Sequence, residues 1–214
     1  MTEVKICGLT EAAGFDTAIE MGADYAGLVF YPPSPRCVSL AQAAGLARRY
    51  KGATQLVGLF VAPEIEQVAV VLQAVKLDIL QIYGSASLVA AIRARFGCPV
   101  WRQLGVSCVE DFPAQDEAAD GFVVEAKPPA GASRPGGNGV LADWALLSGF
   151  RPARPWLLAG GLTPETVAAA IERVGASGVD VSSGVETAPG QKSPALIRRF
   201  IQAARAHEQA RKQD

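Results

Sequence analysis

The sequence contains eight short apolar runs, spaced about 20 to 30 residues apart, with helical patterns between most of them. The runs are almost continuously apolar, which is typical of strands buried on both faces of a parallel sheet. We therefore predict strands over residues 3–8, 25–30, 55–61, 78–83, 99–105, 121–126, 155–159 and 178–182. Eight strand–helix repeats favour a single-domain (β/α)8 TIM barrel over residues 1–214. An open doubly wound sheet remains the alternative, because a sequence determines strand number better than strand order.

Helical signals support this alternation. Apolar residues at helical spacing form one stripe over 65–75. Thr163-Pro164 and Ser193-Pro194 each read as an N-cap followed by a first-turn proline. The segment 108–120 lacks such spacing, so we expect its helix to be short or missing.

Composition excludes several function classes. The net charge of this 214-residue chain is −1 and Lys and Arg form no cluster, which argues against a nucleic-acid partner. No apolar run approaches the ~20 residues that a membrane span requires. The cysteines form no CxxC pair and the one histidine, His207, lies in the charged tail, so no zinc site is expected. Four scattered cysteines without a signal peptide are typical of the cytoplasm.

The loops after the seventh and eighth predicted strands are rich in glycine and serine. Loops in these two positions of a barrel often bind phosphate. Glycines let the backbone approach an anion closely, and serine hydroxyls can donate to it. We expect a phosphate site at Gly160, Gly161, Ser182, Ser183 and Gly184. The alternative is that these glycines only make tight turns.

Other side chains at predicted strand ends could carry chemistry. Cys7 ends the first strand and is a nucleophile, a proton acceptor or a small buried hydrophobe. Asp180 and Glu125 interrupt apolar strands, where an unpaired carboxylate is costly. Glu125 either faces a site or pairs with Lys127. Arg36 follows a proline-stiffened loop and either grips a carboxylate or is solvated.

A further glycine cluster, residues 134–139, lies in a long loop after the sixth strand. A loop of this length is usually functional or disordered. We interpret it as a mobile cover over the site.

Together, seven segments resemble the N-(5'-phosphoribosyl)anthranilate isomerase family. They are KICGLT (5–10), FYPPSPR (30–36), VGLFV (57–61), AKPP (126–129), PGGNG (135–139), LAGGL (158–162) and DVSSGVE (180–186). The resemblance implies a barrel without cofactor or metal, and an Amadori rearrangement in tryptophan biosynthesis. The partner would be a small phosphorylated sugar-amine substrate, and we expect a monomer or weak homodimer.

The resemblance also implies residue roles. Cys7 would be the general base, with its thiolate stabilised by nearby amide donors, and Glu125 the general acid. Arg36 would bind the anthranilate carboxylate, and Asp180 would face the sugar. The phosphate would lie on the glycine-rich loops, at Gly137, Gly160, Gly161, Ser182, Ser183 and Gly184.

The chain departs from the family pattern in the substrate region. Glu125 replaces the usual aspartate, Tyr83 a histidine, Arg102 a lysine and Ala142 an aromatic residue. We expect Tyr83 and Arg102 to contact the substrate. These departures leave three hypotheses open: the family reaction, a paralogue acting on a different phosphorylated amino-sugar, or a non-catalytic protein that binds phosphorylated ligands.

Overall fold

In the computed structural model, which describes residues 1–49, 54–115, 117–127 and 144–211, eight parallel strands close into a barrel. The strands follow one another in chain order, and β1 pairs with both β2 and β8. Their bounds are β1 Glu3–Cys7, β2 Tyr25–Val29, β3 Gln55–Val61, β4 Ile79–Tyr83, β5 Val100–Val106, β6 Gly121–Ala126, β7 Trp156–Leu158 and β8 Gly178–Val181. All eight predicted strands and the closed barrel are confirmed.

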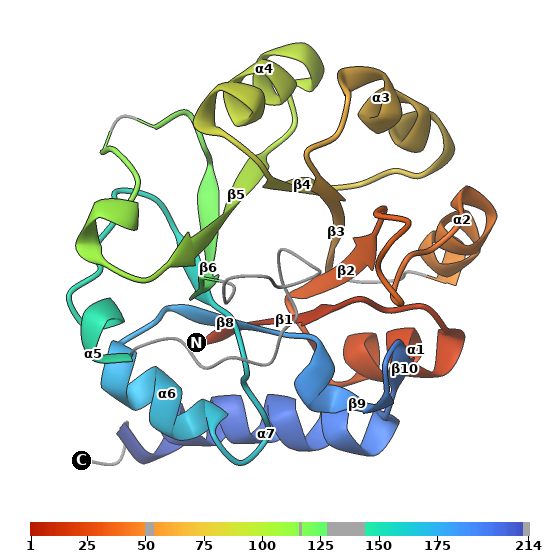
Figure 1. Cartoon of the computed structure of the whole chain (residues 1–214). Coiled ribbons are helices and arrows are strands. Elements are labelled where there is room, and N and C mark those ends of the chain that lie inside the picture. The colour runs from red at the N-terminus through yellow and green to blue at the C-terminus, as the bar shows by residue number, and fades with distance from the viewer. Residues whose placement is uncertain (50–53, 116, 128–143, 212–214) are drawn as a thin grey trace.

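The helices form an outer ring around the strands (Figure 1). They are α1 Ala12–Glu20, α2 Leu40–Arg49, α3 Ile65–Ala74, α4 Ala86–Phe96, α5 Trp144–Leu147, α6 Val167–Val174 and α7 Pro194–Arg211. Between β5 and β6 the described residues contain only the 3-10 turn η1, Val109–Asp111, which confirms that this helix is nearly missing. A second 3-10 turn, η2 (Ser183–Val185), and a small hairpin, β9 (Glu186–Ala188) and β10 (Gln191–Lys192), follow β8. None of the helices in the described ranges is long and apolar enough to cross a membrane.

The two proline signals differ in outcome. Helix α7 begins at Pro194, and the Ser193 hydroxyl accepts a hydrogen bond from the Leu196 amide at 3.3 Å, as predicted. Helix α6 begins only at Val167. The Thr163 hydroxyl instead accepts from the amide of Glu165 at 3.2 Å, so it stabilises a turn that precedes the helix.

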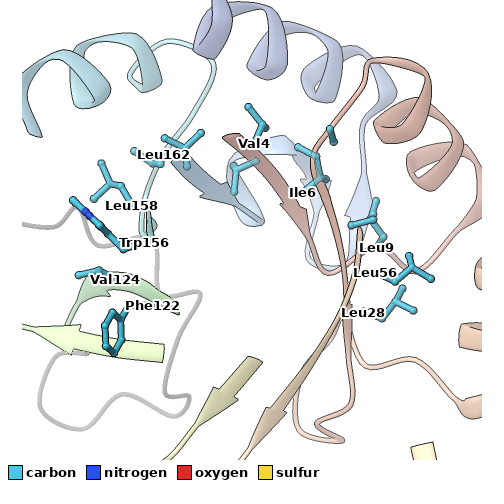
Figure 2. Packing of buried hydrophobic residues seen from close by; sticks show 14 of the residues in the cluster. Val4, Ile6, Leu9, Leu28, Leu56, Phe122, Val124, Trp156, Leu158 and Leu162 are labelled. Atoms are coloured by element: carbon cyan, nitrogen blue, oxygen red, sulfur yellow. The ribbon is translucent and has the colours of Figure 1, made fainter. Parts of the chain in front are cut away.

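Alternation along the strands sorts side chains into two layers. Outward-facing residues pack against the helices; Figure 2 shows Val4, Ile6 and Leu28 among them. Inward-facing apolar residues fill the amino-terminal part of the barrel, where the Tyr25 and Trp101 rings meet edge to face with centroids 4.8 Å apart. Nearer the carboxyl ends the interior is polar, which is where a barrel enzyme places its site. The buried polar residues there are Lys5, Gln81, Gln103, Glu125 and Asp180.

Candidate active site

An open pocket lies at the carboxyl ends of the strands. Of the predicted site residues, it is lined by Cys7, Arg36, Tyr83, Glu125, Gly160, Gly161, Asp180, Ser182, Ser183 and Gly184. These residues come from four strands, β1, β4, β6 and β8, and from the loops that follow β2, β7 and β8. The fold thus brings most of the predicted site residues into one cavity.

Two predicted residues stand apart. Arg102 does not line the pocket, so the expectation that it contacts substrate is corrected. Its neighbours Trp101 and Gln103 face inward, so alternation along β5 sends Arg102 outward. There its guanidinium binds Glu117 Oε2 at 2.7 Å and the carbonyl of Gly84 at 3.1 Å. The other residue, Gly137, lies outside the described residues, as do the remainder of the 134–139 cluster and Ala142.

Cys7 is buried at the end of β1, with 5% of its surface exposed. A Cβ at Gly27 would lie 3.0 Å from the Cys7 sulfur, so the glycine makes room for the thiol. Burial raises the pKa of Cys7 and Asp180 adds to this, while the ammonium groups of Lys5 and Lys192 lower it. We expected amide donors to favour the thiolate; the charges that favour it here are two lysines.

Lys5 lies two residues before Cys7 on the inner face of β1 and is fully buried. Its Nζ binds Asp180 Oδ1 at 2.9 Å. Burial lowers the pKa of Lys5, but Asp180 and Cys7 outweigh burial and hold the pKa above its usual value. Lys5 is therefore a cation in contact with the proposed base and with a pocket carboxylate.

Glu125 receives two hydrogen bonds on one oxygen. The Tyr83 hydroxyl donates to Glu125 Oε1 at 3.1 Å, and Gln103 Nε2 donates to the same atom at 3.0 Å. Burial and the Glu125 carboxylate raise the pKa of Tyr83 well above its usual value, so the phenol stays a donor. Lys127 binds Asp111 at 3.0 Å on the surface, which leaves Glu125 facing the pocket.

Arg36 also lines the pocket, and a partner holds it in place. Its Nε and Nη2 donate to the two oxygens of Glu186 at 2.7 and 2.8 Å. Lys192 Nζ binds Glu186 at 2.6 Å, and it also donates to the Ser182 carbonyl and hydroxyl at 3.0 and 3.1 Å. Burial raises the pKa of Glu186, but Arg36 and Lys192 outweigh burial and lower it. The β9–β10 hairpin thereby connects the predicted carboxylate grip to the predicted phosphate loop.

The predicted phosphate loops have backbones that only glycine accommodates easily. Gly160 and Gly161 have φ values of 88° and 66°, in the left-handed region. A Cβ at Gly184 would overlap the carbonyl oxygen of Leu162, so the loops after β7 and β8 touch through their backbones. Among the described residues no group of three or more His, Cys, Asp or Glu side chains could hold a metal ion.

Sequence reasoning missed several polar residues of the site. Lys5, Gln81 and Gln103 interrupt apolar strands, which is the signal that identified Asp180 and Glu125. Glu186 and Lys192 lie in a hairpin after β8 and gave no such signal. Their pairing depends on tertiary packing.

Comparisons with known proteins agree with this geometry. A family model described as N-(5'-phosphoribosyl)anthranilate (PRA) isomerase matches residues 4–203. The N-(5'-phosphoribosyl)anthranilate isomerase of Acidiphilium cryptum is 50% identical over 206 residues, covering 96% of this chain and 100% of that protein.

Solved structures give the same result. The phosphoribosyl anthranilate isomerase of Thermotoga maritima superposes with a TM-score of 0.83 at 33% identity, covering 96% of this chain and 100% of that one. A phosphoribosyl anthranilate isomerase in complex with reduced 1-(o-carboxyphenylamino)-1-deoxyribulose 5-phosphate gives a TM-score of 0.81 at 32% identity, with the same coverage. The chain therefore belongs to the N-(5'-phosphoribosyl)anthranilate isomerase family of aldose–ketose isomerases.

Proposed function

We propose that this chain converts N-(5'-phosphoribosyl)anthranilate to the corresponding 1-deoxyribulose phosphate, with Cys7 as base and Glu125 as acid. The order of the strands in the barrel supports this proposal. The barrel runs β6, β7, β8, β1, so the glycine-rich loops after β7 and β8 lie between the strands that bear Glu125 and Cys7. A phosphate anchored on those loops would place the sugar between an acid and a base.

The proposed steps follow from these positions. Glu125 gives its proton to the ribose ring oxygen, the C1–O bond breaks, and the nitrogen lone pair forms a Schiff base. The Cys7 thiolate then takes the proton from C2, which gives an enolamine that tautomerises to the ketone as C1 gains a proton. Lys5 and Lys192 favour the thiolate form that this step needs.

Binding roles follow the pocket wall. Asp180, held by Lys5, accepts hydrogen bonds from the sugar hydroxyls. Arg36 lies in the loop after β2, and β1 with Cys7 stands between β2 and the strands β7 and β8 that precede the predicted phosphate loops. Glu186 fixes the orientation of Arg36. It binds the anthranilate carboxylate with its remaining N–H groups.

The test is turnover of freshly generated phosphoribosylanthranilate, followed by loss of its fluorescence. We expect kcat/KM of at least ~10⁴ M⁻¹s⁻¹. Cys7→Ala should abolish turnover and leave the circular dichroism spectrum unchanged; full activity in this variant would refute the base assignment. Absence of turnover in both the native protein and Glu125→Asp would favour a different phosphorylated amino-sugar.

A further inference from the structure

Two neighbouring strands direct hydrogen-bond donors toward a single carboxylate oxygen on the next strand. Tyr83 ends β4, Gln103 lies in β5 and Glu125 lies in β6. All three face the pocket, and both donors bind Glu125 Oε1, at 3.1 Å from Tyr83 and 3.0 Å from Gln103.

The orientation of Gln103 is itself determined by a fourth residue. Gln81, fully buried in β4, donates from Nε2 to Gln103 Oε1 at 2.7 Å. With its amide oxygen engaged by Gln81, Gln103 presents its amide nitrogen to Glu125. The donors therefore run in one direction, from Gln81 through Gln103 to the carboxylate.

We propose that Tyr83 and Gln103 are positioning residues that orient the Glu125 carboxyl group and set how readily it gives up its proton. Donors on Oε1 stabilise the ionised carboxylate more than the neutral acid. This inference rests on the proposed role of Glu125 as acid. When the proton leaves for the ring oxygen, the two donors stabilise the negative charge that remains on the carboxylate.

The contribution of Tyr83 should then depend on the length of the side chain at position 125. The resemblance gave histidine and aspartate at these two positions, and this chain changes both. An aspartate at 125 would withdraw the carboxylate by about 1.5 Å, one carbon–carbon bond, and lengthen both hydrogen bonds beyond useful range. The tyrosine hydroxyl should consequently matter with glutamate at 125 and matter little with aspartate.

A double-mutant cycle tests this coupling, using Tyr83→Phe in the native and the Glu125→Asp backgrounds. We expect Tyr83→Phe to lower kcat about ten-fold in the native background, with little change in KM, and less than about two-fold in Glu125→Asp. Equal losses in both backgrounds would overturn the proposal. The matched control is Tyr25→Phe, which removes a hydroxyl bonded to Glu3 at 3.0 Å at the other end of the barrel and should leave kcat unchanged.

A second readout does not depend on turnover. The carboxyl ¹³C signal of Glu125, assigned by its disappearance in Glu125→Gln, can be titrated in the free protein. Loss of the Tyr83 donor favours the protonated form, so the titration midpoint should rise by about one pH unit in Tyr83→Phe. An unchanged midpoint would overturn this proposal alone. Full activity of Glu125→Gln would overturn the acid assignment and this proposal with it, even if the midpoint moves.

Discussion

At the residue scale, the position of the Cys7 thiol depends on the missing side chain at Gly27. We expect Gly27→Ala to push the sulfur aside, because the new Cβ would lie 3.0 Å from both the Cα and the sulfur of Cys7. A displacement of about 1 Å at a reacting group can cost on the order of 100-fold in rate. Steady-state kcat beside a circular dichroism spectrum is the measurement, and native kcat in the folded variant would contradict the close packing.

The ionisation of Cys7 gives a second prediction at this scale. Burial raises the thiol pKa above its usual 9.0, and Lys192 acts against that shift. We expect the pH midpoint for alkylation of Cys7 by iodoacetamide to lie above 9.0, and to rise further in Lys192→Met. At fixed pH below the midpoint, the variant should react more slowly. Mass spectrometry of the alkylated peptides separates Cys7 from Cys98, which is distant in the sequence and serves as internal control.

Which of these residues the sequence predicts depends on the kind of signal. Glu125 and Asp180 were predicted because an unpaired carboxylate in an apolar strand is costly, and Cys7 because it ends the first strand. The family resemblance put Arg102 in the substrate region, but Trp101 faces inward in β5 and alternation therefore turns Arg102 outward. The sequence alone does not show which face of β5 is inward.

At the element scale, the β9–β10 hairpin packs beside α1 (Figure 1) and explains a glycine inside that helix. A Cβ at Gly14 would lie 2.9 Å from the Cβ of Lys192. We expect Gly14→Ala to displace the hairpin and lower the free energy of unfolding by about 1–2 kcal/mol. Because Lys192 binds Glu186 and Ser182, kcat/KM should fall as well.

Gly45 in α2 is the matched control. A Cβ there would meet only a guanidinium nitrogen of Arg48, at 3.8 Å. Alanine therefore removes the entropic cost of a helical glycine, and Gly45→Ala should stabilise the protein by about 0.5–1 kcal/mol. Urea unfolding of both variants decides the matter. Equal changes in the free energy of unfolding at the two positions would show that the β9–β10 hairpin does not pack closely against Gly14.

Element boundaries were less predictable than element identities. Strands were found because burial on both faces leaves continuous apolar runs. The late start of α6 was missed because Thr163 and Pro164 serve a turn at the pocket rim, next to the loops after β7 and β8. The sequence signal for a cap is local, whereas the position of the helix start depends on how those loops meet.

At the scale of the whole molecule, an ion pair joins β1 to β8, the two strands that close the barrel. Lys5 in β1 and Asp180 in β8 are register partners across the seam that closes the barrel. Their side chains meet at 2.9 Å, with Lys5 fully buried and Asp180 bordering the pocket. A buried pair of this kind contributes little net stability, but removing one partner leaves an uncompensated charge.

The contributions of the Lys5–Asp180 pair to stability and to activity can therefore be measured separately. Lys5→Met should lower the free energy of unfolding by about 3 kcal/mol, at the low end for a broken buried pair because Asp180 borders the open pocket. Adding Asp180→Leu should restore most of that loss, since two apolar side chains fill the space without an unpaired charge. Activity should stay lost in the double variant, because the cation beside Cys7 and the carboxylate that we propose binds the sugar are both gone. Urea unfolding and turnover, measured on the same samples, provide the test. If Asp180→Leu fails to restore stability, the contact between β1 and β8 depends on the charges of this pair.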